Sequence, residues 1–429
     1  MASPSQHHQD RKQRSGRRLA GTSDLPSTRR QLPRWSELRP LLRLRSPEIN
    51  PTRRRLGRAY SIGDLRRLAK RRTPRSVFDY TDGAAETEIS LRRARALFQA
   101  IEFFPEVLHD VSTVDTSTSM LGTPSTLPMA FAPTGFTRMM HHEGESAVAS
   151  VAERRGIPYA LSTLGTTSIE RVAEAAPNAR KWFQLYVQKD RSVGEELMTR
   201  ATDAGYEALI LTVDAPVPGA RMRDVRNGFA IPPALTLRTV ADAALHPAWW
   251  INLLTTEPLT FATLTSWEGT VAELMATLLD PTMTMDDLDW LRSYWRGPLL
   301  VKGIQTVADA RRVVDAGADA IVLSNHGGRQ LDRTQVPLRL VPEVREAVGD
   351  RAEVVVDTGI MSGADIVAAV AAGAHYTLVG RAYLYGLMAG GKPGVDRAVE
   401  ILEMEVRRTM ALLGVAEVRG LQPHHVRIP

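Results

Sequence analysis

The stretch IVLSNHGGRQLD, residues 321–332, places a histidine and an arginine directly after an apolar run. His326 is a side chain that can take up a proton near neutral pH, and Arg329 can hold a carboxylate through two parallel hydrogen bonds. An apolar run that ends in such residues is typical of a strand that delivers a functional loop at its carboxyl end. These residue types suit proton transfer on a substrate that carries an anionic group.

Eight short apolar or β-branched runs predict strands, and most are followed by a stretch with helical spacing. Four such stretches are residues 143–156, 192–205, 306–317 and 362–373, and they end in Ala-Gly or Arg-Gly, as helices often do. Eight strand–helix repeats predict a (β/α)8 TIM barrel. An open doubly wound sheet is the alternative, although its GxGxxG turn is missing after the first run. The predicted strands are residues 127–133, 158–162, 181–186, 208–214, 299–303, 320–328, 353–359 and 376–381.

Polar residues follow nearly every predicted strand, which places them at one mouth of a barrel. A purely structural barrel has no need of them, because each polar group near a core must be solvated or paired. The sequence therefore predicts an active site at this mouth. The residues at the strand ends are Pro133, Thr134, Gly135, Ser162, Gln184, Tyr186, Thr212, Asp214, Lys302, Ser324, His326, Asp357, Gly380 and Arg381.

Two segments interrupt the repeat. Residues 59–110 contain SVFDYTDGAAETE, a helix–loop segment that we expect to cap one end of the barrel. Residues 228–283 form a long insertion after the fourth strand and include Trp249 and Trp250. Long connections are often lids or binding loops, and paired tryptophans also suit a membrane interface. We expect a lid or a membrane-contacting insertion here.

The basic residues are concentrated in the first part of the chain. Residues 1–58 hold 15 Lys and Arg against 4 Asp and Glu, although the formal net charge of the whole chain is only +6. We expect a largely disordered basic tail, with attraction to anionic lipid or nucleic acid as the alternative role. Cysteine is absent, which excludes disulfides and cysteine nucleophiles, and no apolar run reaches the ~18 residues of a transmembrane helix. A cytoplasmic location fits, with any membrane contact peripheral to the inner face of the cell membrane.

Six motifs together carry a resemblance to a known family. They are FDYTDGAAETE, QLYVQKDR, LTVDAPVPGARMRD, LVKGI, SNHGGRQLD and GRAYLYGLMAGG. With them the chain resembles the FMN-dependent enzymes that oxidise L-2-hydroxy acids, and it looks most like the bacterial L-lactate dehydrogenases. The resemblance implies one barrel domain over residues 59–420, between the tail 1–58 and a short C-terminal tail 421–429.

The resemblance implies chemical roles for four residues. His326 matches the catalytic base, and Asp214 matches the carboxylate that orients it and stabilises its charged form. Tyr186 matches a tyrosine near the substrate hydroxyl, and Lys302 matches the lysine beside N1 and O2 of the flavin. Oxidation of a 2-hydroxy acid removes the hydroxyl proton and the α-hydrogen with two electrons, so the reaction needs a base. A lysine cation favours the negative charge that develops on the flavin.

The resemblance also implies binding residues. Arg221 and Arg329, helped by Tyr80, match the residues that hold the substrate carboxylate, a task that suits the planar guanidinium group. A second set matches the FMN site. It comprises Pro133, Thr134, Gly135, Ser162, Gln184, Thr212, Lys302, Ser324, Asp357, Gly359, Gly380 and Arg381.

The chain departs from the family pattern after the seventh strand. The family commonly has Asp-Gly-Gly-x-Arg there, and this chain has DTGIMSG. Thr358 therefore replaces a glycine, and Met361 replaces an arginine that usually contacts the phosphate side of FMN. Arg381, nearby backbone amides and a helix N-terminus at Ser362 are expected to bind the phosphate instead.

The expected function is FMN-dependent oxidation of L-lactate to pyruvate, with electrons passed to a quinone or another carrier. Leu164 stands where glycolate oxidase has an aromatic residue, which permits a small substrate. Gly135 stands where oxidases of the family often have alanine, which favours an acceptor other than oxygen. The same flavin chemistry on another 2-hydroxy acid, or on a peptide-derived redox-cofactor precursor, is the alternative. A catalytically silent flavin-binding scaffold that docks through its tail is a third possibility.

Other partners are expected as follows. The family suggests a homo-oligomer, a tetramer or an octamer. No specific nucleic acid is expected as a partner. His141 and His142 are not expected to bind a metal, because adjacent histidines entering a helix should point apart and no third ligand has suitable spacing.

Overall fold

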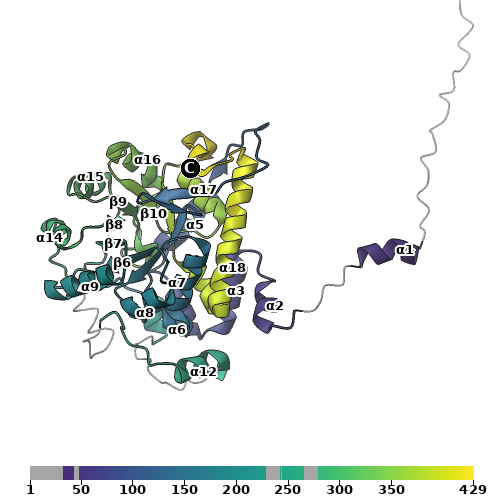
Figure 1. Ribbon diagram of the computed structural model, residues 1–429, viewed down its shortest axis with the longest axis horizontal. Coiled ribbons are helices and arrows are strands. Elements are labelled where there is room, and N and C mark those ends of the chain that lie inside the picture. The colour runs from purple at the N-terminus through teal and green to yellow at the C-terminus, as the bar shows by residue number, and fades with distance from the viewer. Residues whose placement is uncertain (1–31, 43–47, 229–241, 243, 265–278) are drawn as a thin grey trace, which may run out of the picture. The chain divides into compact units, whose positions relative to one another are not determined.

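The computed structural model describes residues 32–42, 48–228, 242, 244–264 and 279–429, and its centre is a closed barrel of parallel strands (Figure 1). Neighbouring barrel strands follow chain order, and the last one pairs with the first. Each predicted run overlaps one barrel strand, so the TIM-barrel prediction is confirmed and the open sheet is wrong. The barrel strands are β4 Met129–Phe131, β5 Tyr159–Ser162, β6 Lys181–Leu185, β7 Ala208–Thr212, β8 Leu299–Ile304, β9 Ala320–Leu323, β10 Glu353–Val356 and β11 Tyr376–Val379.

The strands are apolar on both faces because both faces are covered. Side chains such as Trp182, Ile210 and Tyr376 point into the barrel interior and form one buried cluster. Their neighbours along the strands, such as Phe183 and Leu209, pack in the larger cluster between the strands and the helices. Continuous apolar runs are therefore expected, in contrast to the alternation of a half-exposed sheet.

A short hairpin closes the amino end of the barrel. Its strands are β2 Thr118–Met120 and β3 Thr123–Ser125, and the fully buried Met120 belongs to the interior cluster. The backbone N–H of Leu121 donates to the carboxylate of Glu353, the first residue of β10. Sequence reasoning did not predict this hairpin. It leaves the carboxyl end of the barrel as the mouth that can hold a site.

Helices surround the strands (Figure 1). The four predicted helical stretches correspond to α7, α9, α15 and α17. Hydroxyl groups cap several of them, as Ser362 does by accepting the N–H of Asp365. The helices between the barrel strands are α6 Thr137–Met140, α7 Gly144–Arg155, α8 Ile169–Ala175, α9 Arg191–Asp203, α10 Met222–Arg226, α12 Pro247–Thr255, α14 Asp286–Tyr294, α15 Val307–Asp315, the 3-10 turn η2 His326–Gly328, α16 Pro337–Val348 and α17 Gly363–Ala371.

The N-terminal helices pack on the barrel, as expected for a capping segment. The loop after α4 reaches the carboxyl ends of the strands, because the N–H of Ala85 donates to the carbonyl of Gly328 over 2.8 Å. The helix α3 packs along α18, the long helix after β11, through Leu65 and Ala69. These helices are α2 Pro51–Leu56, α3 Ile62–Arg72, α4 Arg75–Asp82, α5 Ile89–Gln99 and α18 Arg381–Leu413.

The ends of the compact unit differ from the predicted ones. The structure divides the chain at Asn50, because Leu56 is buried and Arg55 donates to the carbonyl of Ala389 in α18. Residues 50–58, which the sequence predicts as part of the tail, belong to this compact unit. The last residues are also part of the fold, since strand β12 Val426–Arg427 pairs with β1 Glu102–Phe103. The short turns η3 Val418–Gly420 and η4 Pro423–His425 precede β12.

The first unit is described over few residues. It contains α1 Trp35–Leu38 and the 3-10 turn η1 Arg39–Leu41, in which no side chain is buried. Residues 1–31 and 43–47 of the predicted tail lie outside the described part, as do 229–241, 243 and 265–278 of the insertion. Among the described residues, no helix has the length and apolar character needed to cross a membrane.

Candidate active site at the carboxyl end of the barrel

A cavity of about 1350 Å³ opens at the mouth where the strands end. Most of the predicted site residues form its wall. Four others, Gln184, Thr212, Asp214 and Ser324, lie buried beside it. The predicted residues that line the cavity are Tyr80, Pro133, Thr134, Gly135, Ser162, Tyr186, Arg221, Lys302, His326, Arg329, Asp357, Gly359, Gly380 and Arg381.

His326 and Asp214 form a hydrogen-bonded pair across two loops. The Nδ1 of His326 lies 3.0 Å from Oδ1 of Asp214, whose side chain is only 2% exposed. Because a carboxylate only accepts hydrogen bonds, Nδ1 carries the proton and Nε2 keeps a lone pair for the cavity. Burial tends to raise the pKa of Asp214, but its interactions with His326 and Lys302, including the hydrogen bond from His326, outweigh burial and hold that pKa below its usual value.

Gly303 makes room for this pair. Its φ is +109°, and a Cβ at this position would lie 2.6 Å from the Cβ of Asp214. The register between β8 and β9 also shifts between Lys302 and Ile304, which is the mark of a bulge. Any larger residue at 303 would push Asp214 away from His326. Sequence reasoning missed this role, although the glycine stands inside the motif LVKGI.

Lys302 is a buried cation that two groups hold in place. Its Nζ donates to Oγ of Ser324 over 3.1 Å and lies 3.2 Å from Oδ2 of Asp357. Burial alone would lower the pKa of Lys302, but the negative charges of Asp357 and Asp214 raise it above its usual value. The ammonium group therefore stays charged in the wall of the cavity.

Two arginines flank the ring of Tyr80 and create a site for an anion. The guanidinium carbons of Arg329 and Arg221 lie 4.8 and 5.1 Å from the ring centre. Burial and the neighbouring charge of Arg221 lower the pKa of Arg329 to about 10. Two cations held this close without an equal negative charge attract an anionic ligand. Asp224 offsets part of the charge, because its Oδ2 lies 3.1 Å from Nε of Arg221.

The wall beside these groups can accept a flavin. The buried Gln184 accepts the hydroxyl of Ser162 through Oε1 over 3.0 Å, while its Nε2 donor has no partner among the described residues. A buried donor of this kind requires an acceptor, and flavin carries ring carbonyl and nitrogen acceptors. Gly135 keeps the wall flat, because a Cβ there would lie 2.8 Å from the Cβ of Leu164. Together with the cation of Lys302, these features fit FMN.

Arg381 is more constrained than expected for a phosphate ligand. Its guanidinium donates to the carbonyl oxygens of Thr81, Gly83 and Gly327 over 3.0, 2.7 and 2.9 Å. Arg381 therefore ties the capping loop to the turn that carries His326. Only part of its guanidinium remains for a ligand.

Another residue that sequence reasoning missed joins two of the active-site loops. Gln330 donates from Nε2 to the carbonyls of Asp214 and Val217 over 3.3 and 3.0 Å, and its Oε1 accepts the N–H of Gly219 over 3.0 Å. The residue lies inside the motif SNHGGRQLD. Its side chain fixes the distance between the loops after β7 and β9, and therefore between Asp214 and His326.

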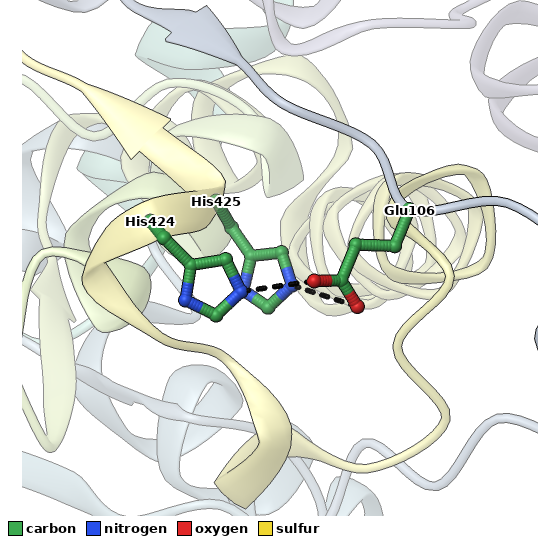
Figure 2. A group of neighbouring side chains, drawn as sticks. All are labelled: Glu106, His424 and His425. Atoms are coloured by element: carbon green, nitrogen blue, oxygen red, sulfur yellow. Dashed lines mark hydrogen bonds and ion pairs between the residues drawn. The ribbon is translucent and has the colours of Figure 1, made fainter.

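A second cluster of ionisable groups lies away from this cavity. Figure 2 shows Glu106 facing His424 and His425, whose Nε2 atoms lie 3.1 and 3.9 Å from its carboxylate oxygens. The Nδ1 of His425 accepts the N–H of Gln422 over 3.0 Å, so its proton sits on Nε2. His425 thus presents an N–H to Glu106 and not the lone pair that a metal requires. The cluster ties the C-terminal segment to the chain beside β1.

One expectation about His141 and His142 was wrong. Their rings do not point apart, because they stack with centres 4.5 Å apart and planes 29° from parallel. Burial, together with the nearby charges of His142 and Arg72, lowers the pKa of His141 to about 3. Folding therefore holds His141 in its neutral form.

This shift predicts a loss of stability in acid. Below pH ~6.5 the unfolded chain protonates His141 while the folded chain does not, so acidification favours unfolding. Between pH 7.5 and pH 5 the shift costs about 2 kcal/mol of unfolding free energy. We expect His141→Gln to remove this part of the pH dependence in urea unfolding measured at both pH values. The exposed His424→Gln is the control, and equal pH dependence in all three proteins would contradict the assignment.

The comparisons with known proteins agree with this geometry. Residues 69–428 match the family model described as FMN-dependent dehydrogenase. The chain is 59% identical to the Mycobacterium tuberculosis protein named "Putative L-lactate dehydrogenase", over 92% of this chain and 96% of that one. It is 42% identical to the L-lactate oxidase of Nostoc sp., over 84% and 96% of the two chains.

A solved structure described as the monotopic membrane protein (S)-mandelate dehydrogenase superposes with a TM-score of 0.82 at 36% identity, covering 87% of this chain and all of the other. The structure of a mandelate oxidase superposes with a TM-score of 0.75 at 38% identity, covering 86% and 98%. The family match spans most of the chain, and the shared fold extends over the whole barrel. The chain is therefore an oxidoreductase that belongs to the FMN-dependent dehydrogenase family.

Proposed function

We propose that the protein oxidises L-lactate to pyruvate with FMN and passes the electrons to a quinone or another carrier. One observation carries the proposal: the His326–Asp214 pair and the arginines 221 and 329 line or border one cavity with the buried cation of Lys302. A base, a carboxylate site and a cation beside the flavin are what this oxidation requires. The names of the curated relatives support L-lactate as the substrate.

The residues divide the work as follows. Arg221 and Arg329 bind the carboxylate and so fix the α-carbon, and Tyr186 lies beside the substrate hydroxyl. His326 takes the hydroxyl proton at Nε2, and Asp214 stabilises the imidazolium that forms. FMN, when bound, would supply the two-electron acceptor for the α-hydrogen, so that pyruvate would be the product. Lys302 favours this transfer by its positive charge.

The pocket wall favours a small substrate without excluding larger ones. Leu164 lines the cavity, and the ring of Phe136 packs edge-on against Tyr80 and Phe261 at 6.0 and 5.0 Å. An aliphatic side chain and a ring edge suit a methyl group. The alternative is another 2-hydroxy acid, and the mandelate-named structural neighbours give a specific reason to test it.

The first experiment is an anaerobic titration of the FMN-loaded protein with L-lactate, (S)-mandelate and glycolate in parallel. We expect L-lactate to bleach the flavin absorbance at the lowest concentration, and a quinone analogue to restore the colour faster than air does. Faster bleaching by (S)-mandelate would make this larger acid the preferred substrate in place of L-lactate. Recovery in air at the same rate as with quinone would make oxygen the acceptor.

We also propose that α12 contacts a lipid surface. This helix, within PAWWINLLT, has no buried side chain, and Ile251 and Leu254 are 60% and 74% exposed. Trp249 anchors it to the barrel by donating Nε1 to the carbonyl of Met139 over 2.9 Å. An apolar helix face with adjacent tryptophans suits the membrane interface. The monotopic membrane description of one structural neighbour supports the same idea.

Vesicle binding tests this contact. Leu254→Glu is expected to weaken co-sedimentation with vesicles that contain phosphatidylglycerol on the order of tenfold, because a buried leucine contributes roughly 1.5–3 kcal/mol. Leu412→Glu changes a leucine of α18 that is 72% exposed and is the matched control. Equal binding by both variants would remove α12 from the contact and leave the basic residues as its source.

A further inference from the structure

The loop after β10 holds a threonine in an unfavourable backbone conformation. Thr358 has φ +80° and is only 3% exposed. Because its side chain is branched at Cβ, this conformation costs on the order of 1–3 kcal/mol, a cost that glycine would avoid. Surrounding interactions must offset this cost. They point to a role for the threonine side chain.

The hydroxyl of Thr358 is bonded to the turn that carries His326. Its Oγ1 accepts the N–H of Gly327 over 3.1 Å and that of Asn325 over 3.4 Å, and it donates to Oδ1 of Asn325 over 3.0 Å. The same Oδ1 accepts the N–H of Gly328 over 2.9 Å. One hydroxyl and one amide side chain therefore hold the backbone N–H groups of residues 325, 327 and 328.

Within the turn η2 the N–H groups of Gly328 and Arg329 donate to the carbonyls of Asn325 and His326 over 2.9 and 3.3 Å, and the Thr358 hydroxyl adds support for Gly327. His326, Gly327 and Gly328 have φ values of +58°, +65° and +76°, so three successive residues are left-handed. Of these three residues, Gly327 donates its N–H to the threonine hydroxyl, whereas His326 donates its N–H to Oγ of Ser324 over 3.0 Å. In the residue before Thr358, Oδ2 of Asp357 lies 3.2 Å from Nζ of Lys302. The loop after β10 thus contacts the His326 turn through Thr358 and the buried lysine through Asp357.

We propose that Thr358 is a positioning residue for His326. Its hydroxyl fixes the turn so that Nδ1 of His326 stays on Asp214 and Nε2 faces the substrate. The inference rests on the proposed role of His326 as the base. A glycine at 358 would relieve the backbone strain and would leave the N–H of Gly327 without its acceptor. The hydrogen bonds of the Thr358 hydroxyl therefore offset the backbone strain and hold His326 in position.

Two variants separate the hydroxyl from the backbone. Thr358→Gly removes both hydroxyl and strain, and Thr358→Ser keeps the hydroxyl. We expect the glycine variant to retain bound FMN while the substrate reduces its flavin 10- to 100-fold more slowly, because a shift of about 1 Å in a catalytic group has effects of this size. The serine variant should stay within about threefold of the parent protein.

A second readout does not depend on the substrate. The Nδ1 proton of His326, hydrogen-bonded to Asp214, should give a downfield proton NMR signal that His326→Gln abolishes and so assigns. We expect the serine variant to keep this signal and the glycine variant to lose or shift it. An unchanged signal in Thr358→Gly, or equal slowing in both variants, would overturn the inference. If L-lactate fails to reduce the parent protein, the proposed substrate fails, whereas the NMR comparison still decides the role of Thr358.

Discussion

His326→Gln is expected to give a folded, yellow protein whose flavin L-lactate reduces about 10²- to 10⁴-fold more slowly than in the parent protein, the range that a positioned general base contributes. Glutamine can still pair with Asp214, which holds His326 over 3.0 Å, but it cannot accept the hydroxyl proton at neutral pH. Stopped-flow absorbance under anaerobic conditions measures the rate. Dithionite should bleach both proteins equally, because this reduction does not need the base.

The control for this variant is His425→Gln, which changes a buried histidine outside the cavity. L-lactate should reduce the flavin of the folded His425→Gln variant at the parental rate. Full-rate bleaching of His326→Gln by L-lactate would remove His326 from the base role. Loss of bound FMN from a folded His326→Gln variant would instead show that His326 supports the cofactor site.

Arg329→Lys is expected to lower kcat/KM for L-lactate about 10²- to 10³-fold while the positive charge is kept. A bidentate arginine–carboxylate pair has two parallel hydrogen bonds, and an ammonium group cannot reproduce that geometry. Arg329 also donates Nη1 to the carbonyl of Tyr80 over 2.5 Å, and this bond positions the capping loop. Steady-state kinetics with a quinone analogue measures the effect.

Two matched variants show whether geometry or charge causes this loss. Arg221→Lys changes the other arginine beside Tyr80, which lies in a wall of the same cavity and is partly neutralised by Asp224. Arg221→Lys should also lower kcat/KM for L-lactate through weaker carboxylate binding, but by a smaller factor than Arg329→Lys. Arg333→Lys changes an arginine whose side chain is 63% exposed, and it should be neutral. Equal losses at 329 and 333 would contradict a carboxylate site formed by Arg329.

The order and number of the barrel strands could be predicted from the amino-acid sequence. Buried parallel strands are short apolar runs, and helix caps and glycines separate them, so local composition is sufficient to find them. Strand ends in a barrel meet at one mouth, which also placed Lys302, His326 and Arg381 together. Strand limits were less accurate. The run that was predicted as a strand to residue 328 ends at Leu323, because the residues after it turn back as η2.

The contacts that position the catalytic groups form only when the chain folds. The hairpin containing Met120, the approach of Asp214 over Gly303 and the bonds from Thr358 to the His326 turn join segments that are distant in sequence. Such contacts depend on where loops of different strands meet, and no local pattern encodes that distance. The lowered pKa of Arg329 arises in the same way, because it needs both burial and the charge of Arg221. Residue types therefore indicated the reaction, whereas the fold alone set the distances and charges that allow it.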